Sequence, residues 1–507
     1  MVKNGKTVRL LIILLVFFFA ISLRMWNLNK MGRTWDEPFY VSQGHSFIDL
    51  IGKGNFIDSL WYKDPDPPAV AKYIYGIADH LDVNRLTLCK SSLCSYDFTS
   101  ARLASVLFSS LTVVLVTLIG IEYISFSVGI IAGVILSMLP IFLGLSQLVT
   151  VESIMIFLFT ACVYSFLHFL KTFSIKNMLI CGILMGLAIG TKYTNVILIP
   201  LLFCIYFLWY FHSNKRIKLF NKRLLFIPFV SLITFFIIWP IPWFHLNEVW
   251  QWERSVHFSD IASHPVPEVF FGRLMPVPIP YYFIYFLITT PFLIVLLFLV
   301  GLKKISDDKE WILYSLVVWF LVPFIQSFLN MRQNGVRYII EIYAPLSLIS
   351  AIGFDFLLNK FIKNQKLKLG LFLLLIVYLF TILQRITPYY LDYFNVIVGG
   401  AKGVYQNRMF QLGWWGQGVR GAAEYIDKNA SAGSSIGVAI SPSHVMPILT
   451  KFIIEKYNPK NKYDFVIVNY YNILREGFDD SEIRNNYAQV YSENADGAKL
   501  ATVYKRK

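Results

Sequence analysis

The chain has 507 residues, of which 56% are hydrophobic, 17% aromatic and only 15% charged, and its formal net charge is +15. This composition excludes a soluble globular protein, because the apolar runs of about 20 residues are long enough to cross a bilayer as helices. The positive charge does not indicate nucleic-acid binding, since the basic residues fall mostly in short loops between apolar runs. That distribution is the one that sets the topology of membrane proteins. Together with the repeated apolar runs, it predicts an all-α polytopic membrane protein.

The apolar runs predict about eleven transmembrane helices, and the loops between them predict the orientation. With the basic segment "MVKNGKTVR" inside, inner loops such as "HSNKRIKLFNKR" are rich in Lys and Arg, whereas the short outer loops carry few. This polarity places the N-terminus in the cytoplasm and the C-terminus outside the cell, with the chain in the plasma membrane. The predicted spans are 8–25, 101–121, 126–146, 152–170, 177–190, 194–211, 224–244, 281–301, 311–329, 338–358 and 369–385.

Polar residues gather in three predicted outer regions. Within a transmembrane domain of residues 1–385, we expect an extracytoplasmic loop at 26–100 with two interfacial helices, and a second loop at 245–280 rich in His, Trp and Pro. A connector, 386–415, then leads to a small extracytoplasmic α/β domain, 416–507. In that domain "GVRGAAEYIDKNA" predicts a helix, and "SSIGVAI" and "YDFVIVNYY" predict strands.

The stretch "GRTWDEPFYVSQG" places two adjacent carboxylates, Asp36 and Glu37, just beyond the first predicted span. A carboxylate at the membrane interface is partly shielded from water and can accept a proton from an attacking acceptor group. Asp36 is therefore a candidate general base, and Glu37 could orient it or contact the acceptor. The alternative is that both acids are solvated surface groups.

Further ionisable residues map to the same outer side. Lys72 follows Pro68 in "DPDPPAVAKYIYG", one turn into a predicted helix, where a cation suits a phosphate. Ionisable groups at membrane depth are expensive and are functional candidates, although each one alone could be an interface anchor. Their convergence on one face favours a shared site. The others open a span or lie in a short outer loop: Arg102, Glu152, Lys192 and Arg337.

Cysteine and histidine residues in the outer loops suggest two further features. Cys89 and Cys94, in "LCKSSLCSY", are a candidate disulfide, because an extracytoplasmic loop permits one. His257 and His264, in the second outer loop, are weak candidates for metal ligands. No cofactor is firmly predicted, and a divalent metal is left as an alternative.

These motifs, in this order, resemble the membrane glycosyltransferases with the C-type fold. More narrowly, they resemble the superfamily of protein O-mannosyltransferases and lipid A aminoarabinose transferases. The resemblance covers about residues 5–425 and includes the acidic pair, the Pro-Pro-x-x-x-Lys helix, "ARLASVLFSSLTVVLVTLIG", "GLAIGTKYTNVILIP", "RYIIEIYAP" and "YYLDYFNVIVGGAKGVY". The chain departs from the family pattern at Asp66, where His is frequent, and at Glu152, where Asp is frequent.

The resemblance implies transfer of a single sugar from a polyprenyl-phosphate donor to a protein or glycolipid acceptor at the outer membrane–water interface, with inversion at the sugar carbon. Asp36 would be the general base, with Glu37 beside it. Basic residues would balance the charge that grows on the leaving phosphate. The residues that the resemblance assigns to substrate binding are Lys72, Arg102, Glu152, Lys192, Arg337 and Tyr338.

Alternatives come from three other classes of protein. An oligosaccharyltransferase or an O-antigen-ligase-like enzyme would use a pyrophosphate donor and usually a metal. A lipid or sugar transporter would place ionisable residues within the spans, and Glu341 and Asp355 keep that hypothesis open. A noncatalytic membrane scaffold would make Asp36 expendable.

Overall fold

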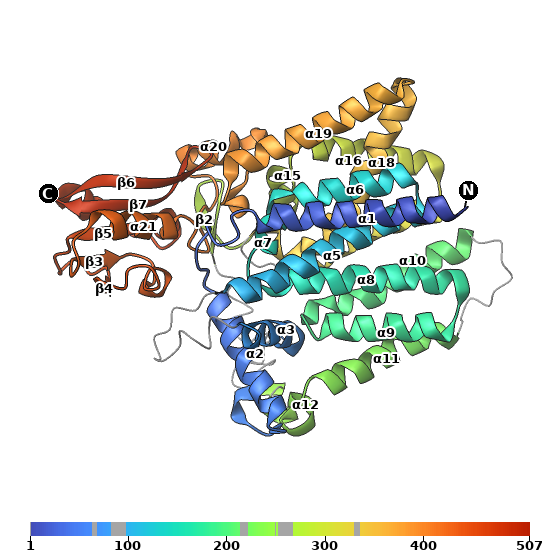
Figure 1. Ribbon diagram of the computed structural model, residues 1–507, viewed down its shortest axis with the longest axis horizontal. Coiled ribbons are helices and arrows are strands. Elements are labelled where there is room, and N and C mark those ends of the chain that lie inside the picture. The colour runs from blue at the N-terminus through green and yellow to red at the C-terminus, as the bar shows by residue number, and fades with distance from the viewer. Residues whose placement is uncertain are drawn as a thin grey trace.

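The computed structural model describes residues 2–62, 68–82, 98–212, 222–248, 250–251, 267–328 and 335–507. Long helices run side by side in a bundle, with the N-terminus at one end and the C-terminal sheet domain beyond the other (Figure 1). At the end that faces this domain, helix α2 (Glu37–Gly52) runs across the direction of the long helices (Figure 1).

The apolar runs of the sequence form the helices of the bundle. In chain order these are α1 (Val2–Met25), α5 (Thr99–Tyr123), α6 (Phe126–Met138), α7 (Pro140–Ser146), α8 (Val151–Thr172), α9 (Ile175–Ile189), α10 (Leu198–His212), α11 (Lys222–Ile238), α12 (Ile241–Phe244), α15 (Tyr281–Thr289), α16 (Phe292–Asp308), α17 (Trp311–Ser327), α18 (Tyr343–Phe361) and α19 (Gln365–Ile386). Two 3₁₀ segments, η2 (Tyr193–Ile197) and η3 (Gly335–Ile342), precede α10 and α18.

Fewer of these helices than predicted are long enough to span a bilayer alone. Within the described residues, six helical stretches pass by length and composition, or eight if each of two bent pairs is one span. The pair α6–α7 bends by 66° and the pair α15–α16 by 113°. A proline, Pro140 or Pro291, lies at each break and prevents the helix from continuing. The predicted count of eleven is therefore not confirmed.

The outward faces of α1, α11 and α19 carry large apolar side chains that are exposed. Exposed apolar surface of this extent suits contact with lipid. The pattern agrees with an integral membrane protein. The exposed residues include Leu11, Leu15 and Phe18 on α1, Phe229, Leu232 and Ile237 on α11, and Leu369, Leu374 and Val377 on α19.

Helix α2 crosses helix α3 (Ala69–His80) at a pair of glycines. A Cβ atom on Gly76 would lie 2.1 Å from the carbonyl oxygen of Gly44, and one on Gly44 would lie 2.2 Å from the carbonyl oxygen of Lys72. The backbones can approach this closely only because neither glycine has a side chain. The N–H of Val70 donates to the carbonyl of Gly190 at 3.0 Å and so joins α3 to the end of α9.

The C-terminal domain is a five-stranded sheet in the order β4-β3-β5-β7-β6, with β3 parallel to β4 and β5, and β7 antiparallel to β5 and β6. Its predicted helix and both predicted strands are present, as α21, β3 and β5. The elements of this region are α20 (Gly400–Asn407), α21 (Val419–Asn429), β3 (Ser435–Val438), β4 (Ile453–Lys456), β5 (Phe465–Asn469), α22 (Tyr470–Arg475), α23 (Ser481–Asn486), β6 (Tyr487–Ala495) and β7 (Ala498–Arg506).

The alternation of side chains along β5 fills both faces of the sheet. Phe465 and Ile467 join the cluster that includes α21, whereas Val466 and Val468 join the cluster on the other face with Ile483 of α23. The sheet is therefore buried on two sides, which explains why "DFVIV" is apolar almost throughout.

The α2–α3 crossing predicts that Gly76→Ala lowers the stability of the folded protein by about 1–3 kcal/mol, because the new methyl group meets backbone atoms that cannot turn away. The apparent melting temperature of the protein in lipid nanodiscs measures this. Gly52→Ala is the matched control, since a Cβ there meets nothing within 4 Å. Equal melting temperatures for the two variants would contradict the importance of the crossing.

Candidate active site

Four of the candidate site residues form one ion-pair cluster centred on Arg337. Its Nη2 donates to Oδ2 of Asp36 at 2.9 Å, and its Nε donates to Oε1 of Glu152 at 2.8 Å. The Nζ of Lys192 lies 3.7 Å from the same oxygen of Glu152. Four separate segments of the chain thus bring two acids and two bases into contact, and the formal charges of the four groups balance.

Exposure changes steadily across this cluster. The side chain of Glu152 is 1% exposed, that of Arg337 7% and that of Lys192 11%, whereas that of Asp36 is 30% exposed. Glu152 lies in the first turn of α8, where the helix N-terminus favours a negative charge. Asp36 precedes α2, and its side chain does not cap that helix. The cluster therefore runs from the buried side chains of Glu152 and Arg337 to the carboxylate of Asp36, which reaches the surface.

Aromatic rings cover the cations of the cluster. The guanidinium of Arg337 lies 4.1 Å from the ring centre of Trp415, and the Nζ of Lys192 lies 4.8 Å from that of Tyr338. Rings at these distances attract a cation and shield it from water. Trp415 was not predicted as a site residue; the "GWWGQG" segment was the available signal, because it follows a motif that carries the family resemblance.

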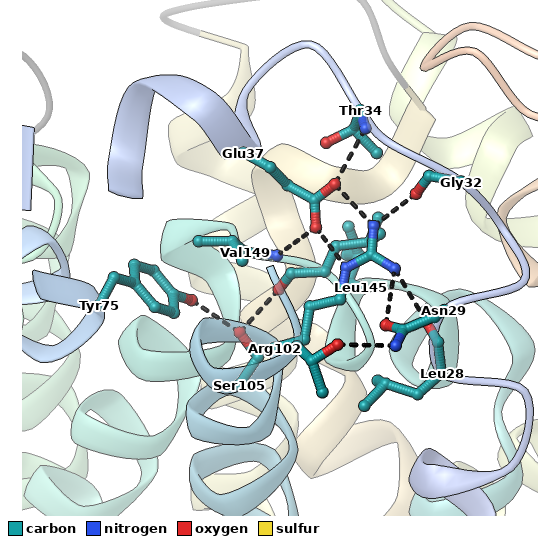
Figure 2. A network of polar contacts seen from close by, with 12 residues as sticks. Leu28, Asn29, Gly32, Thr34, Glu37, Tyr75, Arg102, Ser105, Leu145 and Val149 are labelled. Carbon is teal, nitrogen blue, oxygen red and sulfur yellow. Dashed lines mark hydrogen bonds and ion pairs between the residues drawn. The ribbon is translucent and has the colours of Figure 1, made fainter. Parts of the chain in front are cut away.

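The second acid of the pair, Glu37, is fully buried. Figure 2 shows the groups that surround its carboxylate. Its Oε1 accepts from Nε of Arg102 at 2.7 Å and from the N–H of Val149 at 3.2 Å. Its Oε2 accepts from Nη2 of Arg102 at 2.8 Å and from the N–H of Thr34 at 2.9 Å. Four donors therefore engage both oxygens of this carboxylate, in the bidentate geometry that Arg provides.

Arg102 extends this contact to the segment that follows the first span. Its Nη1 donates to the carbonyl of Leu28 at 3.0 Å, and its Nη2 also donates to the carbonyl of Gly32 (Figure 2). The Glu37–Arg102 pair thus holds together residues 28–37, the start of α5 and the loop before α8. Glu37 follows Asp36 directly and is the first residue of α2, so this pair anchors the start of that helix.

Lys72 lies on α3 and is only 1% exposed. Its Nζ is 5.1 Å from the ring centre of Phe39 and 5.6 Å from that of Phe47, both on α2. Its ammonium group is therefore held between the two crossing helices.

Tyr40 is a buried residue near the cluster that the sequence analysis did not identify. It lies one helical turn after Asp36, and the residue is 6% exposed. Burial, together with the negative charges of Asp36 and Glu152, holds the pKa of its phenol well above the usual value. The hydroxyl therefore keeps its proton throughout the physiological range.

A small pocket, with a cavity volume of about 30 Å³, adjoins Arg337. Its polar lining includes Glu268 on β1 (Glu268–Phe270), which pairs with β2 (Arg273–Met275), and Gln411. The hydroxyl of Tyr285 donates to Oε1 of Glu268 at 3.3 Å. Both amide atoms of Gln411 are buried without a hydrogen-bond partner among the described residues. The sequence analysis found neither Glu268 nor Gln411, because nothing in their neighbourhoods distinguishes them from ordinary loop residues.

The C-terminal domain packs against the segment that carries the acidic pair. The ring of His444 meets that of Trp35 edge to face, with centroids 4.3 Å apart, and Nη1 of Arg420 donates to the carbonyl of Asn29 at 2.7 Å. Burial, reinforced by the positive charge of Arg33, lowers the pKa of His444 to about 4. The neutral ring is therefore the form that fits this interface.

Two expectations from the sequence fall on residues outside the described part of the chain. These are the disulfide between Cys89 and Cys94 and the metal ligands His257 and His264. Both stay predictions. Among the described residues, a separate group of His and Asp side chains that could hold a metal lies between α2 and α3.

Comparison with known proteins places this geometry in a family context. The sequence profile of the family described as "Dolichyl-phosphate-mannose-protein mannosyltransferase" matches residues 90–243. This segment includes Arg102, Glu152 and Lys192. No curated protein matches the chain in sequence.

Solved structures resemble the chain over almost its whole length. ArnT from Cupriavidus metallidurans bound to undecaprenyl phosphate shares 12% identity and a TM-score of 0.53, and the match covers 99% of this chain and 98% of ArnT. The archaeal oligosaccharyltransferase AglB from Archaeoglobus fulgidus, in complex with an inhibitory peptide and a dolichol-phosphate, shares 11% identity and a TM-score of 0.53, covering 99% and 74% of the two chains.

These likenesses define the class of the protein by its fold, which is that of the C-type membrane glycosyltransferases. The family resemblance that the sequence motifs indicated is therefore confirmed.

The buried pair predicts that Glu37→Gln lowers the stability of the protein by about 3–5 kcal/mol, because Arg102 would then be left as an uncompensated buried charge. The melting temperature in nanodiscs measures this loss. Asp307→Asn, which breaks the exposed Lys303–Asp307 pair, serves as the control and should change almost nothing. A Glu37→Gln protein as stable as the native one would contradict the structural role of the pair.

The buried ring of His444 predicts a pH dependence of the domain interface. Its folded pKa of about 4 lies below the value of 6.5 for a free His, so the unfolded state binds the proton first. The stabilisation is therefore full above pH 6.5 and is lost as the pH falls toward 4, by up to about 3 kcal/mol. Melting temperatures between pH 7 and pH 4 measure this. His444→Phe should remove this part of the pH dependence, and identical profiles for the two proteins would refute the assignment.

Proposed function

We propose that the chain is a glycosyltransferase that moves one sugar from a polyprenyl-phosphate donor to an acceptor at the outer membrane–water interface. The observation that carries the proposal is the cluster in which Arg337 links the surface carboxylate of Asp36 to the buried Glu152, beside Lys192. Such an arrangement supplies a base at the surface and a cation deeper in the protein. A donor with its tail in the bilayer and an acceptor arriving from water need these two groups at these two depths.

Lys192 is the group that we assign to the phosphate of the donor. Its Nζ is buried and has no hydrogen-bond partner among the described residues, and its nearest charge is the carboxylate of Glu152. A buried ammonium with unused donors can bind phosphate oxygens strongly, because little water competes. A phosphate monoester is already a weak base, so a cation that balances its growing charge suffices and no general acid is required.

Asp36 is the group that we assign to the acceptor. Arg337 holds one of its oxygens, while the exposed part of the side chain faces the region that an acceptor can reach. In the reaction, the acceptor hydroxyl or amide loses its proton to Asp36 as it attacks the sugar carbon, and the bond to the phosphate breaks. Direct displacement inverts the configuration at that carbon.

The mouth of the pocket beside Arg337 is the place that we assign to the sugar, and the pocket has to widen to admit the ring, because its volume in this structure is about 30 Å³. Glu268 supplies a carboxylate, and Gln411 supplies an amide whose nitrogen and oxygen have no hydrogen-bond partner among the described residues. Both types of group recognise sugar hydroxyls. Trp414 adds an aromatic face to the same pocket. The lining suits a small polar ligand and does not distinguish a hexose from a pentose.

The remaining candidates take supporting roles in this proposal. Glu37 and Arg102 engage each other, so we assign them to positioning Asp36 and not to contact with acceptor or phosphate. Lys72 is enclosed by Phe39 and Phe47, and we keep it as a cation that assists phosphate binding from α3.

The structural neighbours support the class of donor. One was solved with undecaprenyl phosphate and another with a dolichol-phosphate and a peptide. The second is an oligosaccharyltransferase, so transfer of a whole oligosaccharide is the alternative function that a specific observation favours. A protein or glycolipid acceptor, a cytoplasmic N-terminus and an extracytoplasmic C-terminal domain belong to the proposal.

The proposal predicts that purified protein in nanodiscs turns over at least one radiolabelled polyprenyl-phosphate monosaccharide, and that Asp36→Asn lowers the rate by about 10²–10⁴-fold while donor binding persists. Lys192→Met should instead weaken donor binding. Asp58→Asn is the matched control, since Asp58 caps a short 3₁₀ helix in the same outer loop and Asn caps equally well.

Unchanged turnover in Asp36→Asn would remove Asp36 from the role of base. Turnover of pyrophosphate-linked oligosaccharides alone would favour the oligosaccharyltransferase alternative. Failure of the native protein to bind any polyprenyl-phosphate sugar would refute the proposed function.

A further inference from the structure

Two His and two Asp residues meet between α2 and α3, on the helix turns next to the Gly44–Gly76 crossing. His45 and Asp49 lie one turn apart on α2, and Asp79 and His80 are adjacent on α3. Ligand atoms of His45, Asp79 and His80 all lie within 4.8 Å of one another. The two imidazole rings are stacked, with centroids 4.0 Å apart and planes inclined by 15°.

The hydrogen bonds of His80 determine which of its nitrogens carries a proton. Its Nδ1 lies 2.8 Å from the carbonyl oxygen of Gly76, and a carbonyl can only accept, so Nδ1 is the donor. In a neutral ring, Nε2 then presents a lone pair, yet it lies 2.9 Å from Oδ1 of Asp49. Two lone pairs at this distance repel each other, so this contact requires a proton on one of the two groups or a metal ion between them.

His45 lies near a carboxylate at both of its nitrogens, but only its Nδ1 is within hydrogen-bond distance. Its Nδ1 lies 2.8 Å from Oδ2 of Asp79, and its Nε2 lies 3.6 Å from Oδ2 of Asp49. As a neutral ring, His45 can donate from Nδ1 to Asp79, which leaves only one positive ring, His80, against two carboxylates. One divalent cation would balance both carboxylates and leave both rings neutral.

We propose that His45, Asp79 and His80, with Asp49 as the fourth ligand, bind a divalent transition metal of the zinc type. Two imidazoles and two carboxylates are a suitable tetrahedral set for zinc, whereas Mg²⁺ and Ca²⁺ prefer oxygen ligands alone. The ligand atoms of a tetrahedral site lie roughly 3.3 Å apart, and a metal lies near the plane of each imidazole that binds it, so the two rings would have to turn out of their stacked arrangement on binding. The carbonyl of Gly76 orients His80 in the way that outer-shell acceptors orient metal-binding His residues.

The metal would join α2 to α3 independently of the glycine crossing. Because α2 follows Asp36 and α3 carries Lys72, it would fix the spacing of these two residues. The site is separate from the ion-pair cluster around Arg337 and takes no part in the proposed transfer. Metal binding is therefore tested without any sugar donor, and its outcome is independent of whether the proposed function holds.

The experiment is a calorimetric titration of Zn²⁺ into the full-length protein in nanodiscs after treatment with EDTA. We expect binding that Mg²⁺ does not displace, and loss of at least about 10-fold in affinity in the double variant His45→Asn/His80→Asn. His168→Asn is the matched control, because His168 pairs with Glu122 on a different part of the bundle, and its titration should match the native one.

A second measurement uses the native protein alone and so does not depend on the folding of a variant. Titration in weak buffer near pH 6 should release protons as zinc binds, since metal replaces protons on the imidazoles. Zinc binding of unchanged affinity and stoichiometry in the double variant would overturn the proposal, as would the absence of zinc uptake and proton release in the native protein. Either result would mean that protons, and not a metal ion, satisfy the contacts of this cluster.

Discussion

The buried pair of Glu37 and Arg102 is the contact on which the end of the bundle next to the C-terminal domain depends (Figure 1). A carboxylate without solvent is stable only when its oxygens are paired, and here four donors from three segments of the chain supply those pairs. The first residue of α2 is thereby fixed against α5 and the start of α8. Asp36, one residue earlier, has to emerge beside Arg337. The two adjacent acids therefore differ in environment: Glu37 is buried inside the protein, and Asp36 reaches its surface.

The site is completed by the part of the chain that follows the bundle. Trp415 covers the guanidinium of Arg337, Gln411 lines the neighbouring pocket, and His444 rests against Trp35. Rings and amides from the connector and the C-terminal domain therefore contact residues that the helices present. The C-terminal domain is part of the architecture of the candidate site, so protonation of His444 would act next to the acidic pair.

Much of this arrangement could be predicted from the sequence, and the remainder could not for physical reasons. The sidedness of charged residues grouped Asp36, Glu152, Lys192 and Arg337, which the structure joins in one cluster. It also grouped Arg102 and Lys72 with them, whereas the structure pairs Arg102 with Glu37 and holds Lys72 between two aromatic rings. The partner of Glu37 was not visible, since Arg102 is 65 positions away and nothing local marks the pairing. The breaks at α6–α7 and α15–α16 were missed because an apolar run has the same composition whether or not it bends. Glu268 and Gln411 matter only through the pocket that folding creates.

The shortness of α9 has a consequence for the surrounding membrane. With 15 residues it is about 22 Å long, less than the roughly 30 Å thickness of the hydrocarbon core of a bilayer. Lys192 follows shortly after its last residue, Ile189. Lipids next to α9 would have to thin locally to cover it. A lipid headgroup near this helix would then sit deeper than its neighbours, at the level of the buried ammonium. The proposed transfer would then depend on how far the bilayer deforms, and its rate would vary with the chain length of the surrounding lipids.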